Sequence, residues 1–162
     1  MMTNFHELLQ ALVAANVEFI IVGGAAATAH GSARLTEDLD IVYRRTPENI
    51  EHMVAALLPY DPYLRGAPPG LPFKWDQRTI SNGLNFTLIT ALGAIDLLGE
   101  ITGGGNYDDL LPHSIELQLF GLKSLCLGLE RLIHVKRAAG RPKDFEAIAE
   151  LEAILEERRQ QS

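Results

Sequence analysis

The sequence is poor in cysteine, in long apolar runs and in basic residues, and each shortage excludes a class of protein. Cys126 is the single cysteine in 162 residues, so an internal disulfide and a cysteine-based zinc cluster are both excluded. No apolar run reaches the roughly 18 residues of a membrane span, and no basic stretch precedes a long apolar core at the N-terminus. We therefore expect a cytoplasmic protein without a membrane segment.

Basic residues are outnumbered by acidic ones. The chain has 14 Lys and Arg against 21 Asp and Glu, which gives a net charge of −7. This balance disfavours a protein that coats nucleic acid, although it permits a local basic patch over a nucleic-acid end. The hydrophobic share of 47% and the length of the chain are ordinary for one globular domain.

Apolar periodicity predicts helices and strands in a mixed order. Strands are expected at 17–22, 39–43, 84–89, 95–98 and 115–119, and helices at 3–16, 25–30, 46–58, 129–140 and 142–155. Five prolines make 59–72 a loop, and the polar end 156–162 is expected to fray. The predicted fold class is therefore α/β (α+β), with a mixed β-sheet flanked by helices.

The stretch 18–43 carries the strongest chemical pattern. An apolar run ends at Gly23-Gly24, and Asp38 and Asp40 lie at the head of the next run. Residues two apart in a strand point to the same face, so both carboxylates aim at one place. They repel each other unless a cation lies between them, and oxygen ligands suit Mg²⁺ or Mn²⁺. The alternative is a pair of solvated turn acids that precede a strand.

A compound motif extends from the glycine pair to these acids: Gly23-Gly24, Gly31, Arg34, Thr36, Asp38 and Asp40. Two later segments accompany it, Ile95-Asp96-Leu97-Leu98 and 129–144. Together they resemble the polymerase β-like nucleotidyltransferase superfamily, in particular its minimal, AbiEii-like branch, many of whose members are toxins of toxin–antitoxin pairs. The resemblance implies a nucleotidyltransferase core at 1–126, with C-terminal helices at 127–162 packed on it as a single compact unit.

The resemblance also implies a metal site. Asp38 and Asp40 would hold divalent ions, Mg²⁺ or Mn²⁺, which clamp the attacking and leaving oxygens of a phosphoryl displacement. Asp96 would complete the metal shell and act as the base for the acceptor hydroxyl. Its rival is Glu100, on the same face of the expected strand, and the alternative for Asp96 is an acid that faces water from an edge strand.

Nucleotide binding is expected beside the acids. Gly23 and Gly24 either form a tight turn or let a triphosphate approach the backbone, and both interpretations can hold together. Arg34 and Thr36 either touch phosphate or brace the loop. Lys136 belongs to the main basic cluster of this acidic chain and is a candidate phosphate contact, the alternative being a solvated helix face.

The chain departs from the family pattern directly after the glycine pair. Ala25 stands where the family often has a serine, so a hydroxyl for the phosphate is missing there, and Thr28 or Ser32 are candidates to replace it. Three other polar or aromatic residues are expected to be structural, although Trp75 could also stack on a base. They are His30 at a helix end, Trp75 as a loop anchor, and Asp144 as an ion-pair partner.

The expected activity is Mg²⁺-dependent transfer of a nucleoside monophosphate from a nucleoside triphosphate to a hydroxyl acceptor. The toxin branch suggests RNA, in particular a tRNA end, as the acceptor and an antitoxin protein as a partner. Two alternatives stay open. One is a non-catalytic family member that binds a nucleotide or a partner protein, and the other is transfer to a small molecule such as an antibiotic.

Overall fold

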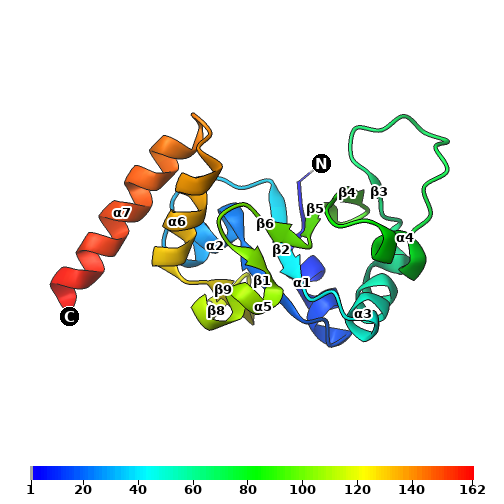
Figure 1. Cartoon of the computed structure of the whole chain (residues 1–162), viewed down its shortest axis with the longest axis horizontal. Coiled ribbons are helices and arrows are strands. Elements are labelled where there is room, and N and C mark those ends of the chain that lie inside the picture. The colour runs from blue at the N-terminus through cyan, green and yellow to red at the C-terminus, as the bar shows by residue number, and fades with distance from the viewer. Residues whose placement is uncertain (1) are drawn as a thin grey trace.

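A mixed sheet of seven strands forms the centre of the molecule (Figure 1). The computed structural model describes residues 2–162. In that range the strands of the sheet are β1 Phe19–Val22, β2 Asp38–Tyr43, β3 Tyr63–Leu64, β4 Phe86–Thr90, β5 Gly93–Leu98, β8 Ser114–Leu119 and β9 Leu122–Leu127. Their order across the sheet is β3-β4-β5-β2-β1-β9-β8, and a separate ribbon pairs β6 Glu100–Ile101 with β7 Gly105–Asn106.

Helices flank this sheet, so the expected α+β class is confirmed. They are α1 Phe5–Ala14, α2 Gly23–Ala29, α3 Pro47–Leu57, α4 Gln77–Asn82, α5 Tyr107–Leu110, α6 Leu129–Ala139 and α7 Asp144–Gln161. Single 3₁₀ turns follow α3 at Leu58–Tyr60 and α5 at Leu111–His113. Within the described chain, none of these helices is both long and apolar enough to cross a bilayer.

The middle of the sheet explains why acids can lie on a central strand. Strand β1 runs antiparallel to β2 and is buried along its whole length, and β2 runs parallel to β5. Leu39 and Ile41 of β2 are fully buried in the core. Because side chains alternate along a strand, Asp38 and Asp40 must emerge on the opposite face. The core therefore fixes the direction in which both carboxylates point.

Several element ends follow their local sequence signals. Thr46 accepts a hydrogen bond from Asn49 N and so caps α3, which begins with Pro47. Gly140 ends α6 in the left-handed conformation, with φ of 63°. Asn16 follows α1 with φ of 58°, a conformation that asparagine tolerates better than most residues.

Three expectations about secondary structure are wrong. The proline-rich stretch 59–72 contains β3, which pairs with β4 at the sheet edge. Strand β9 is absent from the prediction, although it pairs with both β8 and β1. The polar C-terminus continues α7 to Gln161 instead of fraying, because Arg158 donates to His30 O and Arg159 contacts Glu130.

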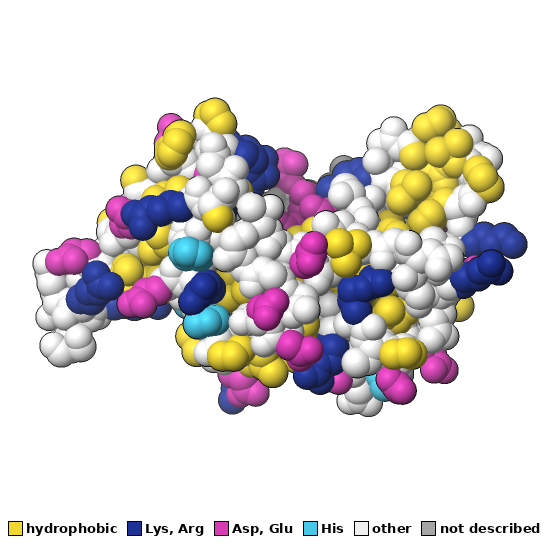
Figure 2. Space-filling view, in the orientation of Figure 1, with side chains coloured by type: hydrophobic (Ala, Val, Ile, Leu, Met, Phe, Trp, Pro, Cys, Tyr) yellow, Lys and Arg dark blue, Asp and Glu magenta, His cyan; other side chains and the backbone are white. Residues whose placement is uncertain are grey.

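Two projections rise from the same side of the molecule. Helices α6 and α7 form one of them, and the loop between β3 and α4 forms the other (Figure 1). Figure 2 shows the surface hollowed between these projections, with acidic side chains at the bottom and basic side chains on both flanks. The motif that ends in the two acids leads into β2, whose label lies between the projections in Figure 1.

Candidate functional site

A row of neighbouring residues crosses the sheet at the base of the hollow. Asp40 of β2 is paired in register with Val22 of β1 on one side and with Asp96 of β5 on the other. Asp96 is in turn paired with Thr87 of β4. Arg65, directly after β3, continues the row because its N–H donates to Thr87 O at 3.0 Å. Residues in register across a sheet present their side chains to the same face, so this row places charged groups together.

The three predicted acids converge. Asp38, Asp40 and Asp96 each contribute a carboxylate oxygen, and these oxygens lie within 4.8 Å of one another. The predicted convergence is confirmed, and cation binding by these acids stays a prediction. Glu100 is not a member of the group, because the chain leaves β5 at Leu98 and Glu100 belongs to the separate β6–β7 ribbon.

Asp40 is the member of the group that most needs a partner. Its Oδ1 is buried and has no hydrogen-bond partner anywhere in residues 2–162. Burial, followed by the neighbouring carboxylates of Asp96 and Asp38, raises the pKa of Asp40 to about 7. A divalent cation would supply the missing partner for Oδ1 and remove the repulsion among the acids. The donor set, made only of oxygen, therefore fits a hard cation such as Mg²⁺ or Mn²⁺.

The glycine pair has a packing reason of its own. Gly23 has φ of 63°, and a Cβ at this position would collide with Asp40 Oδ2. A Cβ on Gly24 would lie 2.7 Å from Thr36 Oγ1. Both glycines are thus required for the close approach of the β1–α2 turn to the start of β2. Helix α2 begins at Gly23 itself, earlier than the expected helix at 25–30.

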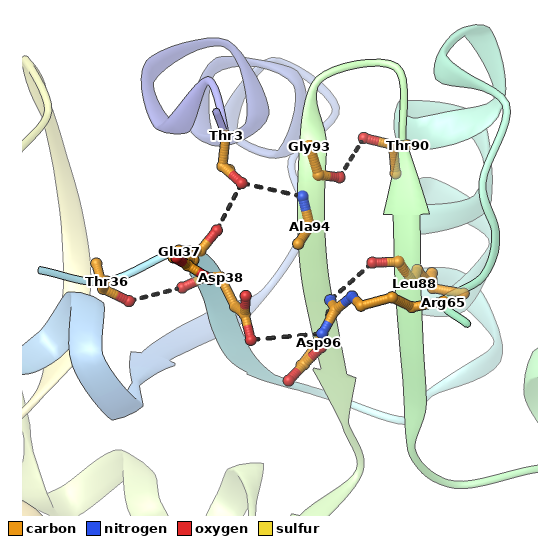
Figure 3. Close-up of polar contacts among 10 residues, drawn as sticks. All are labelled: Thr3, Thr36, Glu37, Asp38, Arg65, Leu88, Thr90, Gly93, Ala94 and Asp96. Carbon is orange, nitrogen blue, oxygen red and sulfur yellow. Dashed lines mark hydrogen bonds and ion pairs between the residues drawn. The ribbon is translucent and has the colours of Figure 1, made fainter. Parts of the chain in front are cut away.

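A second set of hydrogen bonds fixes the start of β2 (Figure 3). Thr36 Oγ1 donates to Asp38 O at 3.1 Å. Thr3 Oγ1 donates to Glu37 O at 2.6 Å and accepts from Ala94 N at 3.1 Å, which ties β2 to β5 directly above the acids. The helix expected at 3–16 therefore begins later than Thr3. Asn4 caps α1, since its side chain accepts from the N–H of the first turn.

Arg65 reaches the acids from the edge of the sheet, and it is not among the site residues predicted from the sequence. Its guanidinium donates to Asp96 Oδ1 at 2.7 Å and contacts Asp38 Oδ2 at 3.4 Å (Figure 3). No periodicity or motif marks this residue, because it lies in the proline-rich stretch that reads as loop. Its significance depends on the pairing of β3 with β4, which brings it level with Asp96.

A cavity of about 430 Å³ opens beside Asp40 on the side of α6. Its lining includes Gly23, Asp40, Glu100, Lys136 and Arg141. The predicted nucleotide contact Lys136 therefore faces the same space as Asp40. Burial lowers the pKa of Lys136, while the charges of Asp144 and Asp40 act in the opposite direction. The arrangement places ammonium and guanidinium groups within one cavity with a carboxylate, as expected for a phosphate-bearing ligand neutralised in part by a cation.

Arg34, in the α2–β2 loop, is held by α7. Its guanidinium contacts Glu146 at 3.4 Å, and its side chain is 47% exposed. Ser32 Oγ donates to Glu150, which also accepts from Ala33 N at 3.1 Å. The α2–β2 loop is therefore braced by α7, and this bracing is one of the two roles considered for Arg34.

The two residues proposed to replace the missing hydroxyl at Ala25 both have hydrogen-bond partners within the protein. Thr28 Oγ1 donates within its own helix to Gly24 O at 3.1 Å, and Ser32 is engaged by Glu150. Thr36 supplies the hydroxyl that does lie against the glycine pair, over Gly24.

The residues expected to be structural have structural contacts. His30 is buried, with Nε2 2.8 Å from Leu127 O, and burial lowers its pKa. Trp75 donates to Val54 O at 2.9 Å and so anchors its loop to α3. Asp144 accepts two hydrogen bonds from Arg141, at 2.8 and 3.2 Å, which confirms its expected role as an ion-pair partner.

In comparisons with known proteins, no family model matches the chain, and no curated protein matches it. Membership of the nucleotidyltransferase superfamily is thus a proposal that rests on the motif in the sequence and on the geometry of the acids.

Proposed function

We propose that this protein is a nucleotidyltransferase that depends on a divalent cation. It would move a nucleoside monophosphate from a nucleoside triphosphate to a hydroxyl acceptor and release pyrophosphate. The observation that carries the proposal is the convergence of Asp38, Asp40 and Asp96 within 4.8 Å, on two parallel central strands, beside a cavity that Lys136 and Arg141 line. Transfer of this kind needs positioning and neutralisation of charge more than covalent chemistry from the protein.

Each group in the site has a defined task in this reaction. The three carboxylates would hold Mg²⁺ or Mn²⁺, which would supply neutralisation of the charge that develops during the transfer. Asp96 accepts the proton of the acceptor hydroxyl, and Arg65 fixes the orientation of its carboxylate. Lys136 and Arg141 bind the phosphates from the α6 side of the cavity.

The nucleotide would extend from the acids towards the glycine pair and the loop that carries Arg34 and Thr36. Asp40 and Thr36 lie against the Cβ side of the two glycines, so a phosphate would approach Gly23 from the cavity that this residue lines. For the acceptor, the family resemblance favours RNA, in particular a tRNA end, and an antitoxin protein as the regulating partner. The hollow between α6–α7 and the loop after β3, with basic side chains on both flanks, suits a phosphate backbone.

Label transfer from triphosphates tests the proposal. We expect transfer from at least one of the four α-³²P-labelled nucleoside triphosphates to total tRNA, in the presence of Mg²⁺ or Mn²⁺ and not of EDTA. Asp38→Asn should lower the rate about a thousandfold, or by ~4 kcal/mol of barrier. Asp61→Asn is the matched control, because Asp61 is exposed and precedes the edge strand β3, which β4 and β5 separate from β2. No transfer by wild type to tRNA, to total RNA or to an aminoglycoside panel contradicts the proposal.

A non-catalytic, nucleotide-binding protein is the second candidate. It is favoured by the hydroxyls of Thr28 and Ser32, neither of which is available to a phosphate at the glycine pair. Calorimetry with each triphosphate separates the two candidates. Binding that Lys136→Gln weakens, together with no transfer to any acceptor, supports the second candidate and contradicts the first.

A further inference from the structure

Arg65 is the arginine that contacts the group of three acids. It bridges two of the three acids, with Nη2 2.7 Å from Asp96 Oδ1 and Nη1 3.4 Å from Asp38 Oδ2. Figure 3 shows the side chain crossing from the edge of the sheet to reach both carboxylates. These are the same carboxylates that the proposed function assigns to a cation. Arg65 and a cation would therefore compete for the same carboxylates.

The backbone holds Arg65 in this place. Its own N–H donates to Thr87 O at 3.0 Å, and its Nη2 also donates to Leu88 O at 2.7 Å. The side chain is 29% exposed, which is less than that of most arginines in the ion pairs of this protein. Both acceptors belong to β4. The position of the guanidinium is therefore fixed by the sheet and not by the loop that follows Arg65.

The neutralisation that Arg65 provides is incomplete. It brings one positive charge to a group of three carboxylates, and its contacts reach only Asp38 and Asp96. Asp40 Oδ1 and Arg65 Nε are both buried without a hydrogen-bond partner in the part of the chain that the structure describes. A buried polar atom without a partner is unfavourable, so neither group reaches its best environment while Arg65 alone faces the acids.

We propose that Arg65 is an internal counter-ion that positions Asp38 and Asp96 when no cation is bound and weakens cation binding by competing for their oxygens. The inference rests on the proposed function in one respect, that the three acids form the cation site. Arg65 is a positioning residue with two opposing effects. It keeps the carboxylates together against their mutual repulsion, and its positive charge repels the incoming ion.

The two contacts differ in strength, which sets the order of release. The contact with Asp38 is 0.7 Å longer than that with Asp96, from 3.4 and 2.7 Å. Asp38 is therefore freed first when a cation approaches. The contact with Asp96 is supported by the shared hydrogen bond to Leu88 O and persists longer. Arg65 then remains beside the bound cation, where it continues to orient Asp96.

Binding of Mn²⁺ to the full chain, without nucleotide, tests this inference. The electron paramagnetic resonance signal of free Mn²⁺ reports the dissociation constant. We expect Arg65→Gln to bind Mn²⁺ at least tenfold more tightly than wild type, because a positive charge is removed next to the ion. Arg65→Lys, which keeps the charge, should stay within about threefold of wild type. Arg44→Gln is the matched control, since Arg44 also contacts two acids, Glu18 and Asp108, in another part of the protein.

The outcomes are distinct. Tighter binding by Arg65→Gln, or binding by this variant when wild type shows none, supports the inference. Equal or weaker binding by a folded Arg65→Gln overturns it and leaves the proposed function intact. No Mn²⁺ binding by wild type or by the variant overturns it as well. In that case, label transfer by wild type decides separately whether the proposed function also fails.

A measurement on wild type alone covers the case in which Arg65→Gln does not fold. Guanidinium resonances of ¹⁵N-labelled protein are followed during titration with Mg²⁺. We expect the Arg65 resonances to shift with saturation, because its contact with Asp38 is lost, and the Arg44 resonances to stay unchanged. Unchanged Arg65 resonances at saturating Mg²⁺ overturn the inference.

Discussion

The sheet side of the hollow and the side formed by α6 and α7 differ in how their charged residues are paired. On the sheet side, three carboxylates meet one arginine. On the side of α6, α7 and their link, oppositely charged residues are joined in pairs. These pairs are Arg34–Glu146, Arg137–Glu152, Arg141–Asp144 and Arg159–Glu130.

This difference separates charged groups that stabilise the fold from charged groups that are proposed to bind a ligand. The ion pairs of α6 and α7 brace the α2–β2 loop and hold these two helices together, so they stabilise the folded state without any ligand. On the sheet side, Asp40 lowers the stability of the free protein, because burial disfavours its ionised form and the carboxylates of Asp96 and Asp38 repel it. The same substitution, aspartate to asparagine, should therefore have opposite effects on the two sides.

Asp40→Asn has the largest expected effect on stability. At pH 8 and in EDTA, we expect the variant to be more stable than wild type by about 2–4 kcal/mol, since the pKa of Asp40 is raised from 3.8 to about 7 in the folded protein. A raised pKa in the folded state favours folding below 3.8 and loses that contribution as the pH rises through 7. Urea denaturation at pH 8 and pH 5 measures the difference, which should shrink at the lower pH.

The same variant tests the functional side of the comparison. Asp40→Asn should lose Mn²⁺ affinity while it gains stability, because the amide cannot supply a charged oxygen to the cation. Asp61→Asn should change neither property. A variant that is less stable than wild type at pH 8 would show that Asp40 is held by favourable contacts, and the contrast between the two sides would fail.

Asp144→Asn should act in the opposite direction, with an intermediate effect. Asp144 has a side chain only 4% exposed, and it accepts two hydrogen bonds from Arg141. Burial alone would raise the pKa of Asp144, but the hydrogen bond and charge of Arg141 outweigh burial and lower it. We expect a loss of about 1–2 kcal/mol at pH 7 in urea denaturation. Because the folded pKa is lowered, the loss should fade as the pH drops below 3.8.

A gain in stability from Asp144→Asn would contradict this assignment. Glu146→Gln is a suitable control, since its side chain is 85% exposed and lies in the same turn of α7. Its effect on stability should stay within about 0.5 kcal/mol.

Much of the fold could be predicted because its signals are local. The alternation of Leu39 and Ile41 with the two acids defines a strand with one buried face, and the same logic placed Asp96 on a strand. Strand β9 was missed because Phe-Gly is not one of the residue pairs that usually mark a two-residue hairpin turn. It pairs with β8 through a tight turn at Phe120 and Gly121, both with positive φ, and with β1 from far along the chain.

The site divides in the same way. Asp38 and Asp40 could be placed together from their spacing alone, whereas the position of Asp96 beside them depends on the parallel pairing of β2 with β5. Arg65 could not be found, because a strand of two residues in a proline-rich stretch leaves no periodic signal. Its role depends on a register across three strands, which no short pattern encodes.

Arg34→Gln has the smallest expected effect on stability. It tests whether the ion pair of Arg34 with Glu146 only braces the α2–β2 loop or whether Arg34 also binds a ligand. The pair with Glu146 is largely exposed, at 47% and 85%, so its loss should change stability by less than about 0.5 kcal/mol. If Arg34 also binds phosphate, the affinity for a non-hydrolysable triphosphate measured by calorimetry should fall about tenfold, or ~1.4 kcal/mol. Arg137→Gln breaks a comparable pair with Glu152 and should leave this affinity unchanged. A large loss of stability with unchanged affinity would limit Arg34 to bracing the loop. A loss of affinity without loss of stability would make the α2–β2 loop part of the ligand site. A ligand would then contact residues on both sides of the hollow.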